Sequence, residues 1–489
     1  MLNKNKLLTI SFVEGASVMA AEICGAKLLA PFFGSSLYVW SSVMAITLGG
    51  LASGYFIGGK LSKRDNKENT LLYVLIAAIC CLCLMPFTTS VFLITASNLS
   101  LIPAVIISVL FLLFPTMICM GATSPLIISI LTSDVNQSGE NSGKIYAIST
   151  VGGILATFLC GFYLIPNFGV QLSLIGFAIA LGLAALFLVF KKKSKVSGFI
   201  ILFVISLALY GFATSKNNRF AIYTSEGILG KLEIRDEPLS SNESVIIRKL
   251  LINNTIQTEM QLDTKQSVSE YVRLVKKNCL YFPKGKALIL GLGGGVVANM
   301  LHDKGYHVTA VEFDQRIIDM AKKYFYLNDS VKTECADARY FINQSKEKYN
   351  LVLFDVFKAE EQPSHVITKE SLTKLKTMLD TSAIVLINTH GYLTGEKGRG
   401  TQCMLATLKN AGFDLKICTF SDNEDYRNLL IVASIKPFNV TLNNELYPIM
   451  LTNLEIINTD NKPVMEALNA NANQEFRTLY LNNYILRNY

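Results

Sequence analysis

Residues 71–131 contain no lysine, arginine, aspartate or glutamate. Soluble domains carry about 25% charged residues, so a stretch of this length without any charge cannot form the surface of one. A helix that crosses a bilayer needs about 20 mostly apolar residues. The whole chain is only 17% charged, with a mean hydropathy of +0.37. The stretch therefore predicts helices in a lipid bilayer.

Seven apolar segments predict a multi-pass bundle of membrane helices in the N-terminal part. They cover about residues 7–30, 37–59, 71–94, 101–131, 145–165, 169–190 and 197–214. The fourth is overlong and contains Pro115 and Pro125, so we expect it to be kinked or partly re-entrant. Small residues in GGLASGYFIGG (49–59) allow helices to approach closely. We expect a domain over residues 1–216 in the cell membrane, with the lipid bilayer as its partner.

Three charged residues interrupt the first apolar segment: Glu14, Glu22 and Lys27. A charge inside a membrane is costly and is therefore a candidate for function. One interpretation is a role in transport or in the access of a substrate. The other is structural, with Glu22 and Lys27 paired with each other or with a neighbouring helix, or extended to the membrane surface. The sequence leaves both open.

The C-terminal part alternates strands and helices. Residues 217–264 contain β-branched runs with a hairpin signal at Asn253 and Asn254, which predicts a small β-sheet. Within 265–489, the candidate strands are 287–291, 307–312, 331–335, 350–355, 383–388, 414–419 and 428–433. Amphipathic helical segments lie between the earlier ones. This alternation predicts an α/β domain built on an open, mainly parallel sheet with helices on both faces.

Glycines and acidic residues stand at the ends of consecutive predicted strands. Gly291–Gly295 follow the first strand, Glu312 ends the second, and Asp355 ends the fourth. Ligands of open α/β sheets bind at the carboxyl ends of the strands. Glycines there let backbone N–H groups approach a ligand, and an acid after the second strand accepts hydrogen bonds from ribose hydroxyls. Asp337, with Ala338 at the end of the third strand, could accept from an adenine amino group. These positions predict a nucleoside-binding pocket.

Several stretches of the chain resemble a known family. In the soluble part they are LILGLGGGVV (288–297), AVEFD (310–314), CADARYF (335–341), YNLVLFDVFKAEEQPSHVITKESL (349–372) and NTDNKPVM (458–465). In the membrane part they are PTMICMGATSPLI (115–127) and KIYAISTVGGILATFLCGFYLIP (144–166). The soluble part resembles spermidine synthase, and the whole chain resembles the membrane-fused spermidine synthase-like proteins. The resemblance implies a doubly wound, Rossmann-like sheet of the class I methyltransferase type over 265–489.

The resemblance also implies an activity and the residues that perform it. The expected enzyme is a transferase that moves an aminopropyl group from decarboxylated S-adenosylmethionine to a small-molecule amine and releases 5′-methylthioadenosine. Asp355 would be the catalytic base. The sulfonium co-substrate would be bound by Gly291, Gly293, Gly294, Gly295, Glu312, Asp337 and Ala338. The amine substrate would contact Gln257 and Tyr271, and His365, in the loop after Asp355, is the histidine expected near it.

The chain departs from the family pattern at two positions. Gly294 stands where spermidine synthases carry an aspartate that receives the amine of the donor's aminopropyl group, and Lys358 stands where a second aspartate receives the amine substrate. Glu360 and Glu361 could replace the second acid if the loop shifted. The missing acids keep two alternatives open. One is a methyltransferase that uses S-adenosylmethionine itself, and the other is a polyamine transporter or sensor with a nucleoside-binding domain.

Charge and cysteine distribution limit the partners. Much of the net charge of +8 lies in short loops beside apolar segments, which favours topology signals over nucleic-acid binding. An odd number of crossings would place the soluble part outside, whereas a cytosolic co-substrate requires it inside. We expect it to be cytoplasmic, with 101–131 or 197–214 not crossing. Six of the ten cysteines lie in apolar segments, so we expect neither structural disulfides nor a metal site. A monomer and a homodimer both remain open.

Overall fold

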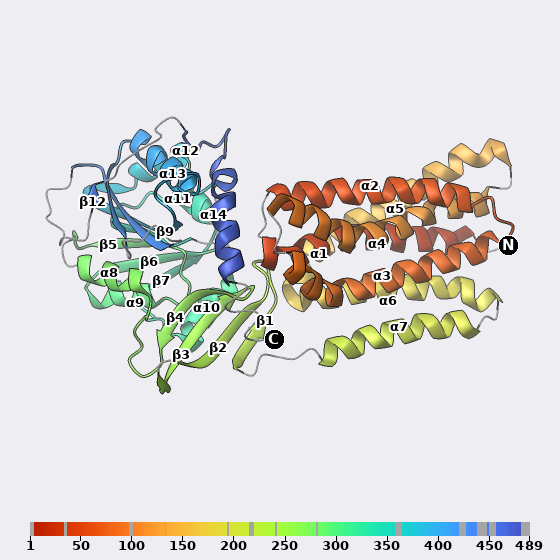
Figure 1. Cartoon of the computed structure of the whole chain (residues 1–489), viewed down its shortest axis with the longest axis horizontal. Helices are drawn as coiled ribbons and strands as arrows, with labels where there is room; N and C mark the ends of the chain where they lie inside the picture. Colours follow the sequence, from red (N-terminus) through yellow and green to blue (C-terminus); the bar gives the residue numbers. More distant parts are fainter. Residues whose placement is uncertain are drawn as a thin grey trace. The chain divides into compact units, whose positions relative to one another are not determined.

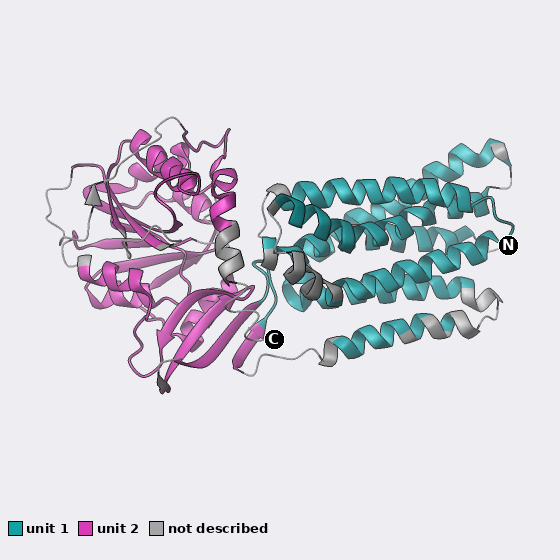
Figure 2. Cartoon of the chain, in the orientation of Figure 1, with its two compact units in different colours: residues 1–218, 225–231 teal, residues 219–224, 232–489 magenta. Residues whose placement is uncertain are grey.

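The chain folds into two compact units (Figure 2). The computed structural model describes residues 4–33, 37–96, 101–132, 134–192, 195–214, 220–239, 242–279, 282–356, 364–419, 427–437, 447–448 and 456–480. The first unit comprises residues 1–218 and 225–231, and the second comprises 219–224 and 232–489.

The first unit consists of long helices (Figure 1). They are α1 (Lys4–Phe33), α2 (Leu37–Leu61), α3 (Lys67–Ala96), α4 (Leu101–Leu131), α5 (Ser138–Leu159), α6 (Ile165–Lys192) and α7 (Lys195–Thr214), with a 3-10 turn η1 (Val135–Gln137) before α5 and a π-helical turn η2 (Cys160–Leu164) after it. Each predicted apolar segment lies in a helix. The fifth runs through α5 and η2 to the start of α6, and α4 is a single helix through both of its prolines rather than a re-entrant turn.

Length and apolar composition qualify five stretches among the described residues to cross a membrane. They are Lys4–Ala30, Val39–Leu61, Lys67–Phe87, Ile102–Leu131 and Ser138–Leu188, the last of which contains both α5 and α6. The outer surface of this unit exposes large apolar side chains, among them Leu48 at 67% and Phe162 at 79%. Such side chains are unfavourable in water but not in lipid. The composition is therefore consistent with the predicted location in a membrane.

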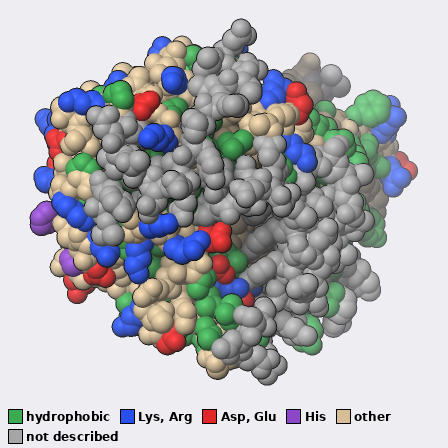
Figure 3. Space-filling model, turned by 60° about the vertical axis from the view of Figure 1, so that its left-hand side comes forward, with side chains coloured by type: hydrophobic (Ala, Val, Ile, Leu, Met, Phe, Trp, Pro, Cys, Tyr) green, Lys and Arg blue, Asp and Glu red, His purple; other side chains and the backbone are tan. Residues whose placement is uncertain are grey.

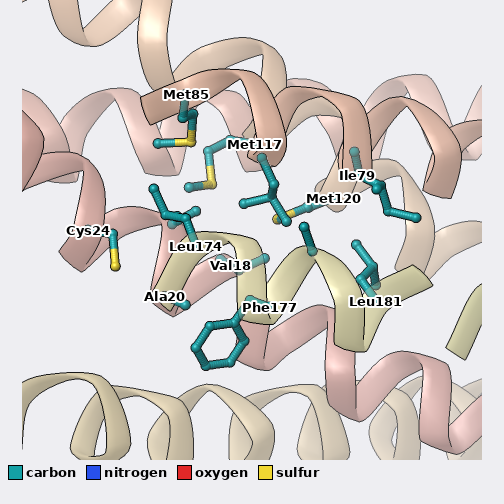
Figure 4. Close-up of a cluster of buried hydrophobic side chains, with 14 of the residues drawn as sticks. Val18, Ala20, Cys24, Ile79, Met85, Met117, Met120, Leu174, Phe177 and Leu181 are labelled. Atoms are coloured by element: carbon teal, nitrogen blue, oxygen red, sulfur yellow. The ribbon is translucent and has the colours of Figure 1, made fainter. Parts of the chain in front are cut away.

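Apolar side chains and glycines hold the helices of this unit together. Val18 of α1, Met117 of α4 and Leu174 of α6 belong to one buried cluster (Figure 4). Glycines mark the closest helix contacts: a Cβ atom on Gly54 of α2 would lie 2.5 Å from the carbonyl oxygen of Ile118 in α4. Any larger residue there would separate the helices, as small-residue packing predicts.

The second unit begins with the small antiparallel sheet. Its strands are β1 (Ala221–Ser225), β2 (Leu232–Leu239), β3 (Asn242–Ile252) and β4 (Thr255–Gln261), hydrogen-bonded in that order. Asn253 and Asn254 connect β3 to β4 with φ angles of +49° and +65°. Two positive φ angles are what a two-residue hairpin turn requires and what asparagine tolerates. The predicted hairpin is confirmed.

The main sheet has eight strands in the order β12-β10-β11-β9-β8-β5-β6-β7. In chain order, the helices and strands of this part are α8 (Glu270–Asn278), β5 (Lys286–Leu290), α9 (Val296–Asp303), β6 (His307–Glu312), α10 (Gln315–Tyr324), β7 (Lys332–Cys335), α11 (Ala338–Gln344), β8 (Tyr349–Phe354), α12 (Lys369–Lys376), β9 (Leu379–Gly391), α13 (Arg399–Asn410), β10 (Asp414–Thr419), β11 (Arg427–Ser434), β12 (Tyr447–Pro448) and α14 (Met465–Tyr480). Strands β7, β6, β5, β8 and β9 are parallel, and β11 is antiparallel to β9. The predicted Rossmann-like fold of the methyltransferase type is confirmed.

Alternate residues of the central strands enter opposite cores. Leu288 and Val352 contribute to the cluster beneath α11, α12 and α13, whereas Ile289 and Leu353 contribute to the one beneath α8, α9 and α10. Burial on both faces is typical of a parallel sheet. Strands β5 and β8 are parallel neighbours whose following helices cover opposite faces, and the order in which strands are added to the sheet reverses between them. The carboxyl ends of these strands flank the crevice in which such folds bind ligands.

Candidate functional site

The glycine turn after β5 lies directly against the end of β8. Asp355 donates its backbone N–H to the carbonyl oxygen of Leu290 at 2.8 Å. Gly291 has a φ of +90°, and a Cβ atom on it would lie 2.2 Å from the carbonyl oxygen of Asp355. Glycine is required here by both conformation and space. The turn and Asp355 are therefore held together as one local structure.

Glu312 ends β6 and is oriented by the backbone. Its Oε2 accepts from Leu292 N in the glycine turn at 3.0 Å, and its Oε1 accepts from Asp314 N at 3.1 Å. The side chain is buried, and burial raises its pKa above the usual value despite these hydrogen bonds. A carboxylate oxygen can accept more than one hydrogen bond, so both oxygens can also accept from a ligand.

Asp337 precedes α11 and caps it. Its Oδ1 accepts from Tyr340 N at 3.0 Å, and its Oδ2 lies 3.1 Å from His365 Nε2. The hydrogen bond from His365 lowers the pKa of Asp337. Ala338 is buried as the first residue of α11. The structure thus brings together three residues that the sequence assigned separately to the nucleoside and to the amine substrate.

Asp355 follows β8 and receives two side-chain donors. Tyr271 Oη, from α8, donates to Oδ2 at 2.6 Å, and Asn388 Nδ2, from β9, donates to Oδ1 at 2.8 Å. Burial raises the pKa of Asp355 above its usual value, although both hydrogen bonds oppose this. The pKa of Tyr271 is raised well above its usual value by burial and by the nearby Asp355 carboxylate. Tyr271 therefore stays protonated as a donor.

Sequence reasoning missed Asn388. The side chain is only 2% exposed at the end of the apolar β9 run IVLIN. A polar residue that ends an apolar strand beside the strand of Asp355 was the available signal. His390 also belongs to β9, where burial lowers its pKa to about 4. It lies two residues beyond Asn388, which places both on the same face of the strand.

Strand β4 of the small sheet covers the glycine turn. Thr258 Oγ1 accepts from Gly294 N at 2.8 Å. Gln257 is half-buried beside it, and its Nε2 lies 3.4 Å from the carbonyl oxygen of Thr255. Its own carbonyl oxygen would lie 3.8 Å from a Cβ atom on Gly293. Thr258, which sequence reasoning did not select, therefore makes the direct contact with the turn.

The space beside Gly294 is filled. A Cβ atom there would lie 2.8 Å from both Phe325 Cδ1 and Thr258 Cγ2, closer than ordinary packing permits. A side chain at position 294 would therefore meet neighbours that already occupy the room. The fourth glycine of the turn, Gly295, has a φ of +75°. Lys358, Glu360 and Glu361 lie outside the described residues.

Two of the charged residues in the first apolar segment have defined contacts. Glu14 is 3% exposed and accepts a hydrogen bond from Ser149 Oγ of α5 at 3.2 Å. Lys27 Nζ donates to the carbonyl oxygen of Ile228 at 2.9 Å. These contacts are compatible with the structural interpretation of the intramembrane charges.

Lysines and arginines of the second unit are interspersed with other side chains. Figure 3 shows them at many separate places on the face it presents, with acidic side chains between them. Several pair with acids on neighbouring strands: Arg248 binds Asp236 through two nitrogens, and Lys249 lies 3.0 Å from Glu237. Such ion pairs neutralise part of the basic charge of this unit.

Known proteins are similar to this chain in sequence, and solved structures match part of it. The spermine/spermidine synthase domain family matches residues 267–421. A polyamine aminopropyltransferase of Vibrio vulnificus is 28% identical over 205 residues, which are 37% of this chain and 67% of that protein. Polyamine aminopropyltransferase 2 of Aquifex aeolicus is 24% identical over 420 residues, 82% of each chain. The crystal structure of spermidine synthase from Thermotoga maritima is 11% identical with a TM-score of 0.35, and the match covers 49% of this chain and 82% of that one.

The matches confirm the predicted resemblance and the predicted class of transferase. The domain match contains the glycine turn, Glu312, Asp337 and Asp355, whereas the Aquifex match extends into the helical unit. Residues 267–421 match the spermine/spermidine synthase domain family, and the chain is similar in sequence to polyamine aminopropyltransferases. It also carries helices apolar enough to span a membrane.

Proposed function

We propose that this protein is a membrane-bound aminopropyltransferase that uses decarboxylated S-adenosylmethionine and a small amine. The observation that carries the proposal is the environment of Asp355. Its carboxylate is buried at the end of β8, receives hydrogen bonds from Tyr271 and Asn388, and lies beside the glycine turn. A carboxylate with a raised pKa is a stronger base than an exposed one.

In the proposed reaction Asp355 removes a proton from the ammonium form of the amine. The freed nitrogen attacks the methylene carbon bonded to the sulfonium sulfur. The new C–N bond forms as the C–S bond breaks, and the electron pair of that bond neutralises the sulfur in 5′-methylthioadenosine. The proton stays on Asp355 until it passes to solvent. Tyr271 and Asn388 hold the carboxylate in place, because each donates to a different oxygen.

The nucleoside half of the co-substrate would lie along the neighbouring strand ends. Glu312 has lone pairs free for the ribose hydroxyls, and its position is fixed by Leu292 N and Asp314 N. Asp337 and Ala338, at the start of α11, would face the adenine. The fixed backbone donors support this assignment, since a pocket that is already ordered loses little entropy on binding.

The filled space at Gly294 bears on the choice of donor. The glycine turn supplies no carboxylate for the amine of an aminopropyl group, and packing by Phe325 and Thr258 leaves no room for one. This observation keeps methyl transfer from intact S-adenosylmethionine as the second candidate. The two reactions release different nucleosides, 5′-methylthioadenosine or S-adenosylhomocysteine, and product identity separates them.

The test uses the full chain in lipid nanodiscs with each sulfonium donor in turn and the diamine putrescine. We expect 5′-methylthioadenosine and a longer polyamine from the decarboxylated donor, and neither product from the Asp355→Asn variant. Release of S-adenosylhomocysteine would establish methyl transfer instead. If neither donor reacts while proteoliposomes accumulate putrescine, the protein is a transporter and the proposal is wrong.

We also propose that the helical unit crosses the cell membrane and that the soluble unit is cytoplasmic. The apolar composition of the helices supports insertion into the membrane. The supply of the co-substrate from the cytosol supports a cytoplasmic location of the α/β unit. Reporter fusions after residues 195 and 216 should then both report the cytoplasm, with α7 not crossing. A periplasmic signal after residue 216 would contradict this topology.

A further inference from the structure

The segment 458–464, NTDNKPV, is anchored to the α/β domain through Asn458. This residue is fully buried. Its Nδ2 donates to the carbonyl oxygens of Ser364 and Ile367, both at 2.8 Å, and its Oδ1 accepts from Val464 N at 3.0 Å. Its backbone accepts from Lys369 N at 2.9 Å. One asparagine therefore holds the chain that leads into α12.

A second anchor is the group formed by Asp460, Arg339 and Thr368. Arg339 donates to Asp460 Oδ2 and to Thr368 Oγ1, each at 2.8 Å. Thr368 Oγ1 donates to Asp460 Oδ1 at 2.7 Å. Thr368 is 1% exposed and caps α12 by accepting from Ser371 N. Asp460 thus connects α11 to the start of α12.

These anchors adjoin the contact between Asp337 and His365. Arg339 lies two residues after Asp337, and Ser364 immediately precedes His365. The two side chains of the contact are themselves 35% and 55% exposed. A polar contact this exposed contributes little to its own stability. Its geometry must therefore come from the backbone on either side, which the 458–464 segment joins.

We propose that residues 458–464 form a clasp that positions His365 against Asp337 and thereby sets the affinity of the adenine end of the pocket. The inference rests on the proposed function, because it assumes that Asp337 binds the nucleoside. Asn458 and Asp460 are positioning residues: they touch Ser364, Ile367, Thr368 and Arg339, and act on the ligand through His365 and Asp337.

The first test is Asp460→Asn in the full chain. The amide keeps the size but has no charge and only one acceptor oxygen, so it cannot accept from both Arg339 and Thr368 as the carboxylate does. The connection between α11 and α12 is therefore weakened, although the hydrogen bond from Arg339 to Thr368 remains. We expect the dissociation constant for 5′-methylthioadenosine, measured by isothermal titration, to rise about three- to tenfold. Lys462→Gln is the matched control, since it removes an exposed charge from the same segment, and its dissociation constant should equal that of the wild type.

A double-mutant cycle separates positioning from general destabilisation. If the clasp acts through His365, then Asp460→Asn should add no further loss of affinity to His365→Ala. Independent effects that multiply would overturn the proposal, and so would an unchanged dissociation constant in Asp460→Asn. Arg339→Lys, which keeps the charge but cannot reach both partners, repeats the test if Asp460→Asn does not fold.

Hydrogen exchange of the ligand-free chain distinguishes failure of the clasp from failure of the proposed function. Amides of residues 364–369 should exchange faster in Asp460→Asn than in the wild type or in Lys462→Gln. If the wild type binds no nucleoside, the proposed function and the ligand part of this inference both fall, whatever the exchange shows. Suppose that the wild type binds the nucleoside, and that Asp460→Asn exchanges faster but keeps the dissociation constant of the wild type. The segment then only stabilises the fold, and the clasp proposal is wrong while the proposed function stands.

Discussion

The two ends of the candidate pocket are held in different ways. At the nucleoside end, Glu312 is oriented by backbone N–H groups of Leu292 and Asp314. At the reaction end, Asp355 is oriented by the side chains of Tyr271 and Asn388, which lie 84 and 33 residues away in the sequence. Backbone donors persist when neighbouring side chains change. We therefore expect the nucleoside end to tolerate distant substitutions and the reaction end to be sensitive to them.

The largest expected effect is that of Asp355→Asn, which tests the reaction end directly. The amide has nearly the same shape but cannot take the proton of the amine. Turnover should fall by about 10²–10⁴-fold, the usual share of a general base, while the dissociation constant for 5′-methylthioadenosine stays close to that of the wild type. Full activity would show that Asp355 is only structural. Loss of nucleoside binding in this variant would show that Asp355 also belongs to the nucleoside end.

Tyr271→Phe tests whether a distant side chain controls the reaction end. Asp355 must be ionised to act, and the Tyr271 hydroxyl stabilises the ionised form, so its removal raises the pKa of Asp355 further. The acid limb of the pH profile of kcat/KM should move to higher pH. Loss of a hydrogen bond to a charged group is worth about 1.5–3 kcal/mol, which corresponds to at least about a tenfold lower rate on that limb. A limb that moves to lower pH would contradict this role.

Glu312→Gln tests the nucleoside end. Glutamine keeps the size of the side chain, but it loses the charge that strengthens hydrogen bonds from the ribose hydroxyls, and one of its ends becomes a donor. The dissociation constant for 5′-methylthioadenosine should rise about tenfold or more. Glu334→Gln on the neighbouring β7, where the side chain pairs with Lys332 near the surface, is the control and should bind normally. Unchanged binding in Glu312→Gln would remove it from the site.

The smallest of the four effects is expected from Gly294→Ala, which probes the boundary between the ends. The new methyl group would contact Phe325 and Thr258 at 2.8 Å. Overpacking of this kind costs about 1–3 kcal/mol of folding stability, which thermal unfolding would measure. Gly294→Asp should be destabilised as well and should not gain affinity for the decarboxylated donor. A gain in that affinity would mean that the turn can open to restore the family's acid.

Sequence reasoning predicted most of the fold and the places of the glycine turn and of Glu312 at the strand ends. The seven apolar segments form helices and the seven predicted strands of the main sheet lie where they were expected, because burial in a helical bundle or in a parallel sheet demands long apolar runs. The short strand β12 was not predicted. Gly291 and Glu312 could be selected from their positions in the sequence alone, since each stands at the end of a predicted strand. Their hydrogen-bond partners are near neighbours or lie on the adjacent strand, so a local pattern was sufficient.

The partners at the reaction end were not predictable in the same way. Asn388 and Thr258 belong to β9 and β4, strands that approach Asp355 and Gly294 only when the sheets have formed. Sequence reasoning assigned His365 to the amine substrate and did not predict its contact with Asp337. No periodicity encodes such pairs, because they depend on strand order and on how the small sheet packs on the glycine turn.

By itself, the sequence determined that the chain has a lipid-compatible helical part and an α/β part with glycine and acid at the strand ends. Hydrophobic periodicity and backbone conformation are local properties, and short stretches carry them. The tertiary structure alone decided which side chains donate to Asp355, that Phe325 and Thr258 close the space at Gly294, and that Asn458 holds the chain beside His365. Each of these requires two distant segments to meet, and only the packing of the folded chain specifies where they do.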